Sequence, residues 1–65
     1  MKRQALLKTL RRIAKENDLT ILTEEGKRHT HVTINGQLVT VPRHREIAEG
    51  TARSIIKLAE EEAAK

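Results

Sequence analysis

The start of the chain combines apolar and basic side chains with the period of an α-helix. Leu6, Leu10 and Ile13 recur at intervals of three and four residues, which places them on one helical face. The other face carries the basic side chains Lys8, Arg11, Arg12 and Lys15. We predict an amphipathic helix over residues 3–16, which the Asn17-Asp18 pair ends.

The middle of the chain alternates between apolar and polar residues with the period of two that is typical of half-buried strands. Residues 19–23 are apolar and β-branched, and Glu24–Gly26 then turns the chain. Asn35-Gly36 interrupts the next alternating stretch and is a strong signal for a two-residue type I′ turn. That turn pairs residues whose numbers add up to 71, so Val32 faces Val39.

The predicted hairpin separates the core residues from the histidines. One face carries the residues expected in the core, which are Thr30, Val32, Ile34, Val39 and Val41. The opposite face carries His29, His31, Thr33 and Thr40, with Leu38 as an exposed apolar residue near the turn. We therefore expect both histidines to be exposed on the side of the sheet away from the core.

The last third of the chain predicts a connector and a second helix. Pro42 ends the strand because it cannot donate a ladder hydrogen bond. Residues 43–46 form the connector between this strand and the last helix. The next apolar stripe has helical spacing and consists of Ala52, Ile55, Ile56 and Ala59. We expect this helix to start at Gly50-Thr51, with Thr51 as its N-cap, and to fray over Glu60–Glu62 and the alanines after them.

The element order indicates the fold class. A helix, three strands and a helix form an α+β, α-β-β-β-α two-layer domain, with an antiparallel three-stranded sheet and two helices on one face. Residues 1–65 are short enough for one domain only. A core of this size supplies only about 3–5 kcal/mol of net stability.

The composition excludes several classes of site. There is no cysteine, so disulfides, thiolate metal sites and cysteine nucleophiles are excluded. Phe, Tyr and Trp are also absent, which argues against modules that read bases by stacking them on aromatic rings. No apolar run reaches signal-peptide or membrane-span length, so we expect a soluble cytoplasmic protein without membrane contact.

The charge is distributed unevenly. Residues 1–45 hold 10 basic and 4 acidic groups, whereas residues 46–65 hold 3 and 5. A basic surface over the first two thirds favours a polyanionic partner, because phosphate contacts release counterions. An ordinary solvated lysine-rich face explains the charge equally well.

His29 is the strongest candidate for chemistry. It follows Lys27 and Arg28 directly, and an imidazole with a typical pKa near ~6.5 can both take and give a proton at neutral pH. This combination suits RNA cleavage, in which a base deprotonates the ribose 2′-hydroxyl, an acid protonates the leaving oxygen and cations stabilise the phosphorane charge. The other interpretation is a surface histidine in a basic loop.

The remaining candidates are weaker. His31 lies two residues further along the same face and is either a second proton-transfer or RNA-contacting group, or an exposed neighbour of Thr40. Arg43 and His44 follow the proline and are candidates for phosphate contact, with plain solvation as the alternative. A zinc site formed by His29, His31 and His44 lacks a thiolate or a nearby carboxylate, so we expect neither a metal nor another cofactor.

Most other enzyme classes lack their motifs in this chain. There is no glycine-rich phosphate loop, no recognisable pair of catalytic carboxylates and no Ser-His-Asp constellation. Small-molecule cofactors are therefore not expected. Contacts to phosphates, sugars and helix shape remain the expected mode if a nucleic acid is bound.

Three motifs resemble those of a known family. Gly26-Lys-Arg-His29, Val39-Thr-Val-Pro-Arg-His44 and Gly50-Thr-Ala-Arg-Ser-Ile-Ile-Lys57, in this order and spacing, resemble the HicA-type toxins of HicAB toxin–antitoxin pairs. The resemblance implies a fold like that of the double-stranded-RNA-binding domain. It also implies a metal-independent endoribonuclease, or mRNA interferase, that arrests translation and is blocked by a HicB-type antitoxin covering the active site.

The resemblance also bears on the site residues. A single histidine after the glycine at the start of the second strand is catalytic in that family, and here this role falls most naturally on His29. The common family motif has this histidine two residues after the glycine, where the present chain has Arg28. Neighbouring strand residues point to opposite faces, so the register decides whether an imidazole reaches the substrate. Two alternatives stay open, which are a non-catalytic double-stranded-RNA-binding module and a protein-binding remnant.

Overall fold

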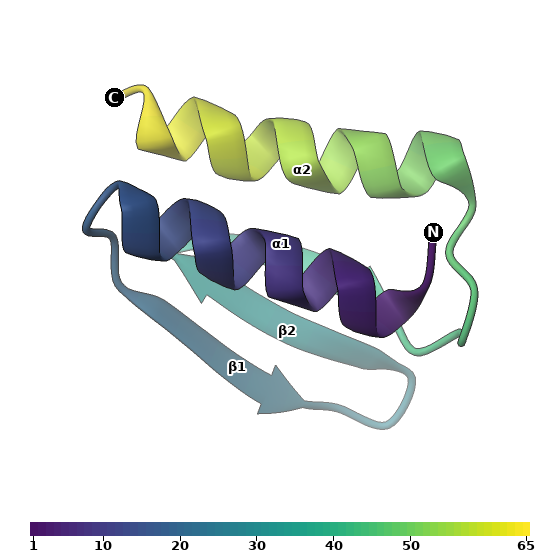
Figure 1. Cartoon of the computed structure of the whole chain (residues 1–65). Helices are drawn as coiled ribbons and strands as arrows, with labels where there is room; N and C mark the ends of the chain where they lie inside the picture. Colours follow the sequence, from purple (N-terminus) through teal and green to yellow (C-terminus); the bar gives the residue numbers. More distant parts are fainter.

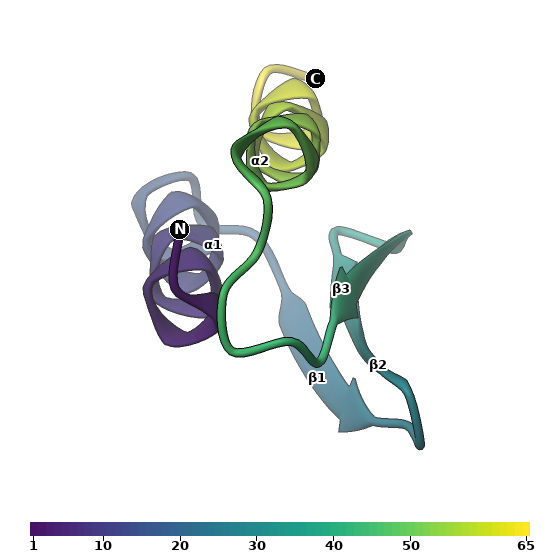
Figure 2. The ribbon, with the colours of Figure 1, turned by 90° about the vertical axis from the view of Figure 1, so that its right-hand side faces the viewer.

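The computed structural model describes all residues, 1–65, and has the predicted element order. The elements are α1 (Arg3–Glu16), β1 (Ile21–Glu25), β2 (His29–Ile34), β3 (Gln37–Pro42) and α2 (Glu49–Ala63). The two helices run side by side over the sheet (Figure 1), and the view along their axes shows both on the same side of it (Figure 2). The predicted α+β two-layer architecture is therefore confirmed.

The hairpin of β2 and β3 has the predicted register, with Val32 opposite Val39 and the same offset at all six pairs. Asn35 and Gly36 have φ values of 50° and 85°, as a type I′ turn requires. Both strands of the sheet that flank β2 are antiparallel to it, in the order β1-β2-β3. Leu38 is 55% exposed, as expected from its place near the turn.

The first strand lies two residues later than predicted. It spans Ile21–Glu25 rather than 19–23, so the segment predicted as a turn is still largely paired. The reason is that the preceding residues connect α1 to the sheet. The N–H of Leu19 donates to Ala14 O at 2.8 Å, and Thr20 O accepts from Asn35 N–H at 2.8 Å. The Thr20–Asn35 bond continues the register of β1 and β2, whereas the bond of Leu19 ties the preceding residue to the end of α1, so the regular strand begins only after this connection.

The core lies between the sheet and the helices. Leu6 and Leu10 of α1, Val32 and Ile34 of β2 and Val41 of β3 are at most 1% exposed. The predicted stripe of α2 is buried at Ala52, Ile55 and Ala59, while Ile56 is half-buried beside them. Thr30 is buried too, although it is polar. The predicted core face of the hairpin is thus confirmed residue by residue.

The predicted start of α2 is wrong. The helix begins at Glu49 with Ala48 as N-cap, and Thr51 lies exposed within its first turn. The first helical bond runs from Ala52 N–H to Ala48 O at 2.9 Å, and the negative Glu49 suits the helix N-terminus. The other end, predicted to fray, is helical through Ala63 in the structure. Glu62 is 7% exposed, and its carboxylate accepts from Lys65 Nζ at 2.6 Å.

The chain start pairs with the connector between β3 and α2. Met1 and Ile47 exchange two hydrogen bonds of 3.0 and 2.7 Å, and Arg3 N–H donates to Arg45 O at 3.0 Å. This pairing draws the connector against the first turn of α1 (Figure 1). Neither helix has the length and apolar character needed to cross a membrane.

Candidate functional site

The site that the sequence singled out lies at the tip of the β1–β2 hairpin. Gly26 and His29 close the hairpin, with Gly26 N–H donating to His29 O at 2.9 Å. Lys27 and Arg28 form the exposed loop between them. A Cβ at Gly26 would lie 2.8 Å from His29 O, so the tip needs glycine at this position for the close approach of the two strands.

His29 and His31 lie on the face of the sheet that no helix covers. We call this the open face, and its residues are Leu22, Glu24, His29, His31, Thr33, Leu38, Thr40 and Pro42. Both imidazoles are exposed, because the alternate residues of β2 supply the core. The expected exposure of the two histidines is confirmed, and strand rise separates their Cα atoms by about 6.5–7 Å.

The neighbours of the two histidines differ. His29 stands opposite Pro42, at the end of the sheet beside the basic loop. His31 lies in the central strand between Glu24 on β1 and Thr40 on β3. The Cε1 atom of His31 lies 3.6 Å from where a Cβ of Gly26 would be, so its ring leans towards the hairpin tip. The imidazoles of His29 and His31 and the carboxylate of Glu24 therefore lie at the same end of the open face.

A polar cluster on the opposite side of the sheet holds the tip in place. The Glu25 carboxylate lies 3.3 Å from Arg3 Nη2 and 3.4 Å from Arg43 Nε, and accepts from Thr30 Oγ1 at 3.2 Å. Arg3 Nη2 also donates to Thr30 Oγ1, which gives this buried hydroxyl a donor as well as an acceptor. One carboxylate thus ties α1, β1, β2 and the end of β3 together.

Arg43 is engaged within the protein. Its Nη1 donates to Gly26 O at 3.0 Å in addition to the Glu25 contact, while half of its side chain stays exposed. From its sequence position after the proline, Arg43 is a candidate phosphate contact. In the structure Arg43 is hydrogen-bonded to Gly26, the residue directly before the Lys27-Arg28 loop. Its main role is therefore to hold that loop in position.

His44 follows Pro42, the residue opposite His29, by two positions. It is exposed in the connector after β3, outside the ladder that carries His29 and His31. No group of three or more His, Cys, Asp or Glu side chains is arranged to hold a metal ion. The hairpin tip therefore carries Lys27, Arg28 and His29, with His31 two residues further along β2, whereas His44 belongs to the connector after β3.

The sequence reasoning missed the supporting residues Arg3, Glu25 and Thr30. Thr30 carried a signal, because the alternation placed a hydroxyl on the core face, where a buried polar group needs partners. Its partners are Glu25, five residues away, and Arg3, 27 residues away. Only the packing of α1 on the sheet brings Arg3 to this point.

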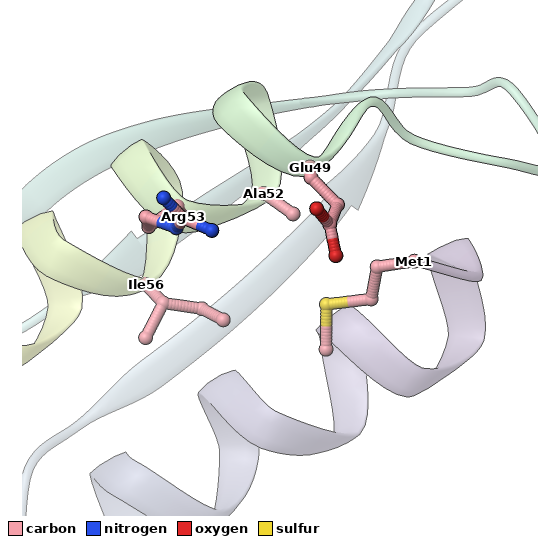
Figure 3. Close-up of a pocket in the computed structure, with 5 residues that line it drawn as sticks. All are labelled: Met1, Glu49, Ala52, Arg53 and Ile56. Carbon is pink, nitrogen blue, oxygen red and sulfur yellow. The ribbon is translucent and has the colours of Figure 1, made fainter.

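A separate hollow lies between the chain start and α2 (Figure 3). Its volume is about 180 Å³, and it is lined by Met1, Glu49, Ala52, Arg53 and Ile56. Figure 3 shows the Glu49 carboxylate directed towards Met1, across from the Ala52 methyl. No histidine reaches this hollow, and it is not part of the tip site.

Comparison with known proteins finds no relative of this chain. No family model matches it, and no curated protein or solved structure matches it.

Proposed function

We propose that this protein is a HicA-like mRNA interferase, a metal-independent endoribonuclease that acts as the toxin of a toxin–antitoxin pair. The observation that carries the proposal is the position of His29. Its imidazole is exposed at the first residue of β2, on the open face, directly after Lys27 and Arg28. An RNA strand can reach a ring in this position without any movement of the helices.

The proposed chemistry is an internal transesterification. His29 takes the proton of a ribose 2′-hydroxyl, and the 2′-oxygen attacks the adjacent phosphorus. The bond from phosphorus to the 5′-oxygen breaks, so the products are a 2′,3′-cyclic phosphate and a 5′-hydroxyl. The leaving oxygen takes a proton as it departs, and His31 is the nearest second imidazole for this role.

The basic loop supplies the charge that this reaction needs. Lys27 and Arg28 have no intramolecular partner, so their cations are available to the phosphate as negative charge builds on its oxygens. Arg43 positions the loop through Gly26 O and reaches the phosphate only with the exposed part of its side chain. His44 contacts RNA outside the reacting nucleotides in this proposal.

A HicB-type antitoxin is the proposed protein partner, and mRNA is the proposed substrate. The resemblance of the three motifs supports both. An antitoxin that covers the open face at the tip would remove His29 from solvent and stop cleavage. Co-expression with a HicB-type protein tests this, since the complex should purify as one species with no nuclease activity.

The test of the chemistry is cleavage of mRNA in EDTA by the wild type and by His29→Ala. Thr33→Ala is the matched control, because Thr33 lies on the same face of β2 but four residues from the tip. We expect cleavage by the wild type and the control, loss with His29→Ala, and cyclic phosphate at the product ends. Equal cleavage by all three proteins, or none by any, contradicts the catalytic role of His29.

The second candidate is a non-catalytic module that binds double-stranded RNA. Arg28 favours it, because this residue occupies the place two after the glycine where the family has its histidine. A module of this kind binds duplex RNA over about 16 base pairs and reads its shape. Duplex binding without any degradation supports this candidate over the nuclease.

A further inference from the structure

A basic groove runs along α1, outside the tip site. One hollow of about 300 Å³ is lined by Lys2, Arg3, Gln4 and Arg45. A second, of about 470 Å³, is lined by Arg3, Gln4, Leu7, Lys8, Arg11 and Glu25. The two hollows share Arg3 and Gln4, so they lie next to each other along the helix, and together we call them the α1 groove. The pairing of Arg3 with Arg45 creates its upper end, because it holds the connector against the helix.

The charge of the α1 groove is strongly positive. Five of its eight lining residues are basic, and its one acidic residue, Glu25, is already neutralised by Arg3 and Arg43. The other four cations, Lys2, Lys8, Arg11 and Arg45, form no ion pair in the structure. Arg12, outside the groove, differs in this respect, since it pairs with Glu16 at 3.7 Å. Unpaired cations gathered in a hollow attract a polyanion.

A phosphodiester chain fits this groove better than a nucleobase does. Lys2 and Arg11 are separated by about 14 Å along the helix axis, so the cations form a line rather than one cluster. No aromatic side chain is present for stacking, which leaves phosphate contacts as the source of binding. The only buried apolar residue among those lining the groove is Leu7, so there is little surface for an apolar partner.

The groove leads to the tip. Glu25 ends β1 in the lower hollow, and Gly26 and the Lys27-Arg28 loop follow directly. His29, however, lies on the open face, on the other side of the sheet. A chain that follows the groove and reaches His29 must bend around the loop, which a flexible single strand does and a stiff duplex does not. In-line attack by a 2′-hydroxyl also requires a nucleotide free of the regular duplex geometry.

We propose that the α1 groove binds the sugar–phosphate backbone of a single RNA strand and leads it around the Lys27-Arg28 loop to His29. This inference rests on the proposed function and specifies how the substrate is held. Binding is then independent of base sequence along α1, and falls steeply with salt. Any preference for a cleavage site arises at the tip and not along the helix.

The test compares two double variants of equal charge. Lys8→Gln with Arg11→Gln removes two groove cations, whereas Arg53→Gln with Lys57→Gln removes two exposed cations of α2. Both pairs are made in a His29→Ala background, so that the probe is bound but not cut. The probe is a short fluorescent oligouridylate, which forms no duplex. Circular dichroism checks that both proteins keep their helices.

The groove variant should bind on the order of tenfold more weakly near 0.1 M salt, with the slope of log affinity against log salt reduced by about 1.4. The α2 variant should change affinity less than twofold. Equal losses in both variants, or no loss in the groove variant, overturn the proposal. Tighter binding of a duplex of equal length overturns the single-strand assignment. Equal competition by polyglutamate overturns the assignment to RNA.

The experiments distinguish failure of the groove proposal from failure of the nuclease proposal. If the wild type cleaves RNA but the groove variant binds like the control, the groove assignment fails and the nuclease stands. If binding depends on the groove but the wild type cleaves nothing, the groove stands and the nuclease fails.

Discussion

At the scale of single residues, the account depends on how closely two strands meet at the hairpin tip. Gly26 has no side chain, and this absence lets its N–H reach His29 O. The carbonyl oxygen of the same residue, Gly26, accepts a hydrogen bond from Arg43 Nη1. The backbone at Gly26 therefore fixes both the loop and the first residue of β2.

Gly26→Ala should destabilise the protein by about 1–3 kcal/mol, because the new Cβ meets a backbone oxygen that cannot move away cheaply. Gly50→Ala is the matched control. Its Cβ meets nothing within 4 Å and lies in α2, so this change should stabilise by about 0.5–1 kcal/mol. Urea unfolding of the two variants measures both values, and equal effects at the two glycines contradict this account of the tip.

Thr30→Val should destabilise by about 1 kcal/mol, although valine has nearly the same shape and is more apolar. The change removes the hydroxyl that bonds both Arg3 and Glu25 in a buried position. Thr33→Val, on the other face of the same strand, should have little effect because Thr33 has no such bonds. A Thr30→Val protein at least as stable as the wild type would show that the polar cluster does not support the tip.

The residue scale also shows what the sequence could and could not predict. The exposure of His29 followed from the alternation along β2, since Thr30, Val32 and Ile34 had to share the core face. The partners of Arg43 did not follow, because Gly26 lies 17 residues away and meets it only after the sheet has formed. Local patterns predict which face a side chain takes, but not which distant group it meets there.

At the scale of elements, the end of a helix or strand could be predicted from the sequence where neighbouring residues determine it. It could not be predicted where packing against distant residues determines it. The turn of β2 and β3 was predictable because Asn35 and Gly36 accept positive φ, and this turn fixes every pair in the hairpin. The start of α2 was not predictable in this way. Its N-cap is Ala48, which has no side-chain group that could form a capping hydrogen bond and so gives no signal in the sequence. Its final turn is held by the burial of Glu62 and by Asn35 Nδ2 at 3.5 Å, a contact between distant parts of the chain.

The final turn of α2 should depend on pH through Lys65. The hydrogen bond and attraction from Glu62 raise the pKa of Lys65 above its ordinary value of 10.5. A lysine whose folded pKa is raised contributes stability below pH 10.5 and loses it as the pH rises through the folded value. The wild type should therefore melt at a higher temperature than Lys65→Met at neutral pH, with the difference vanishing in strong alkali. A difference that persists there contradicts the ionic origin of this contribution.

At the scale of the whole molecule, the two faces of the sheet differ in role, because one is buried in the core and the other is exposed to solvent. The helices cover one side and build its core (Figure 2). The open face carries the two histidines near the hairpin tip. The basic side chains continue from the tip into the α1 groove, while α2 carries the acidic end of the chain. A polyanion that binds this molecule is therefore expected on the α1 side and at the tip.

The uneven charge along the sequence predicted a basic region but not its shape. The α1 groove exists because the connector after β3 pairs with the chain start and brings Arg45 beside Lys2 and Arg3. These residues are more than forty positions apart in sequence. Topology, rather than any local motif, assembles this surface.

The most direct measurement of the central claim is the rate of RNA cleavage by the wild type and by His29→Ala, with Thr33→Ala beside them, all in EDTA. Loss of a general acid–base group lowers a rate by about 10²–10⁴-fold, and the account predicts a loss in this range for His29→Ala only. Cleavage at the wild-type rate by His29→Ala, or the absence of cleavage from every protein, would contradict it.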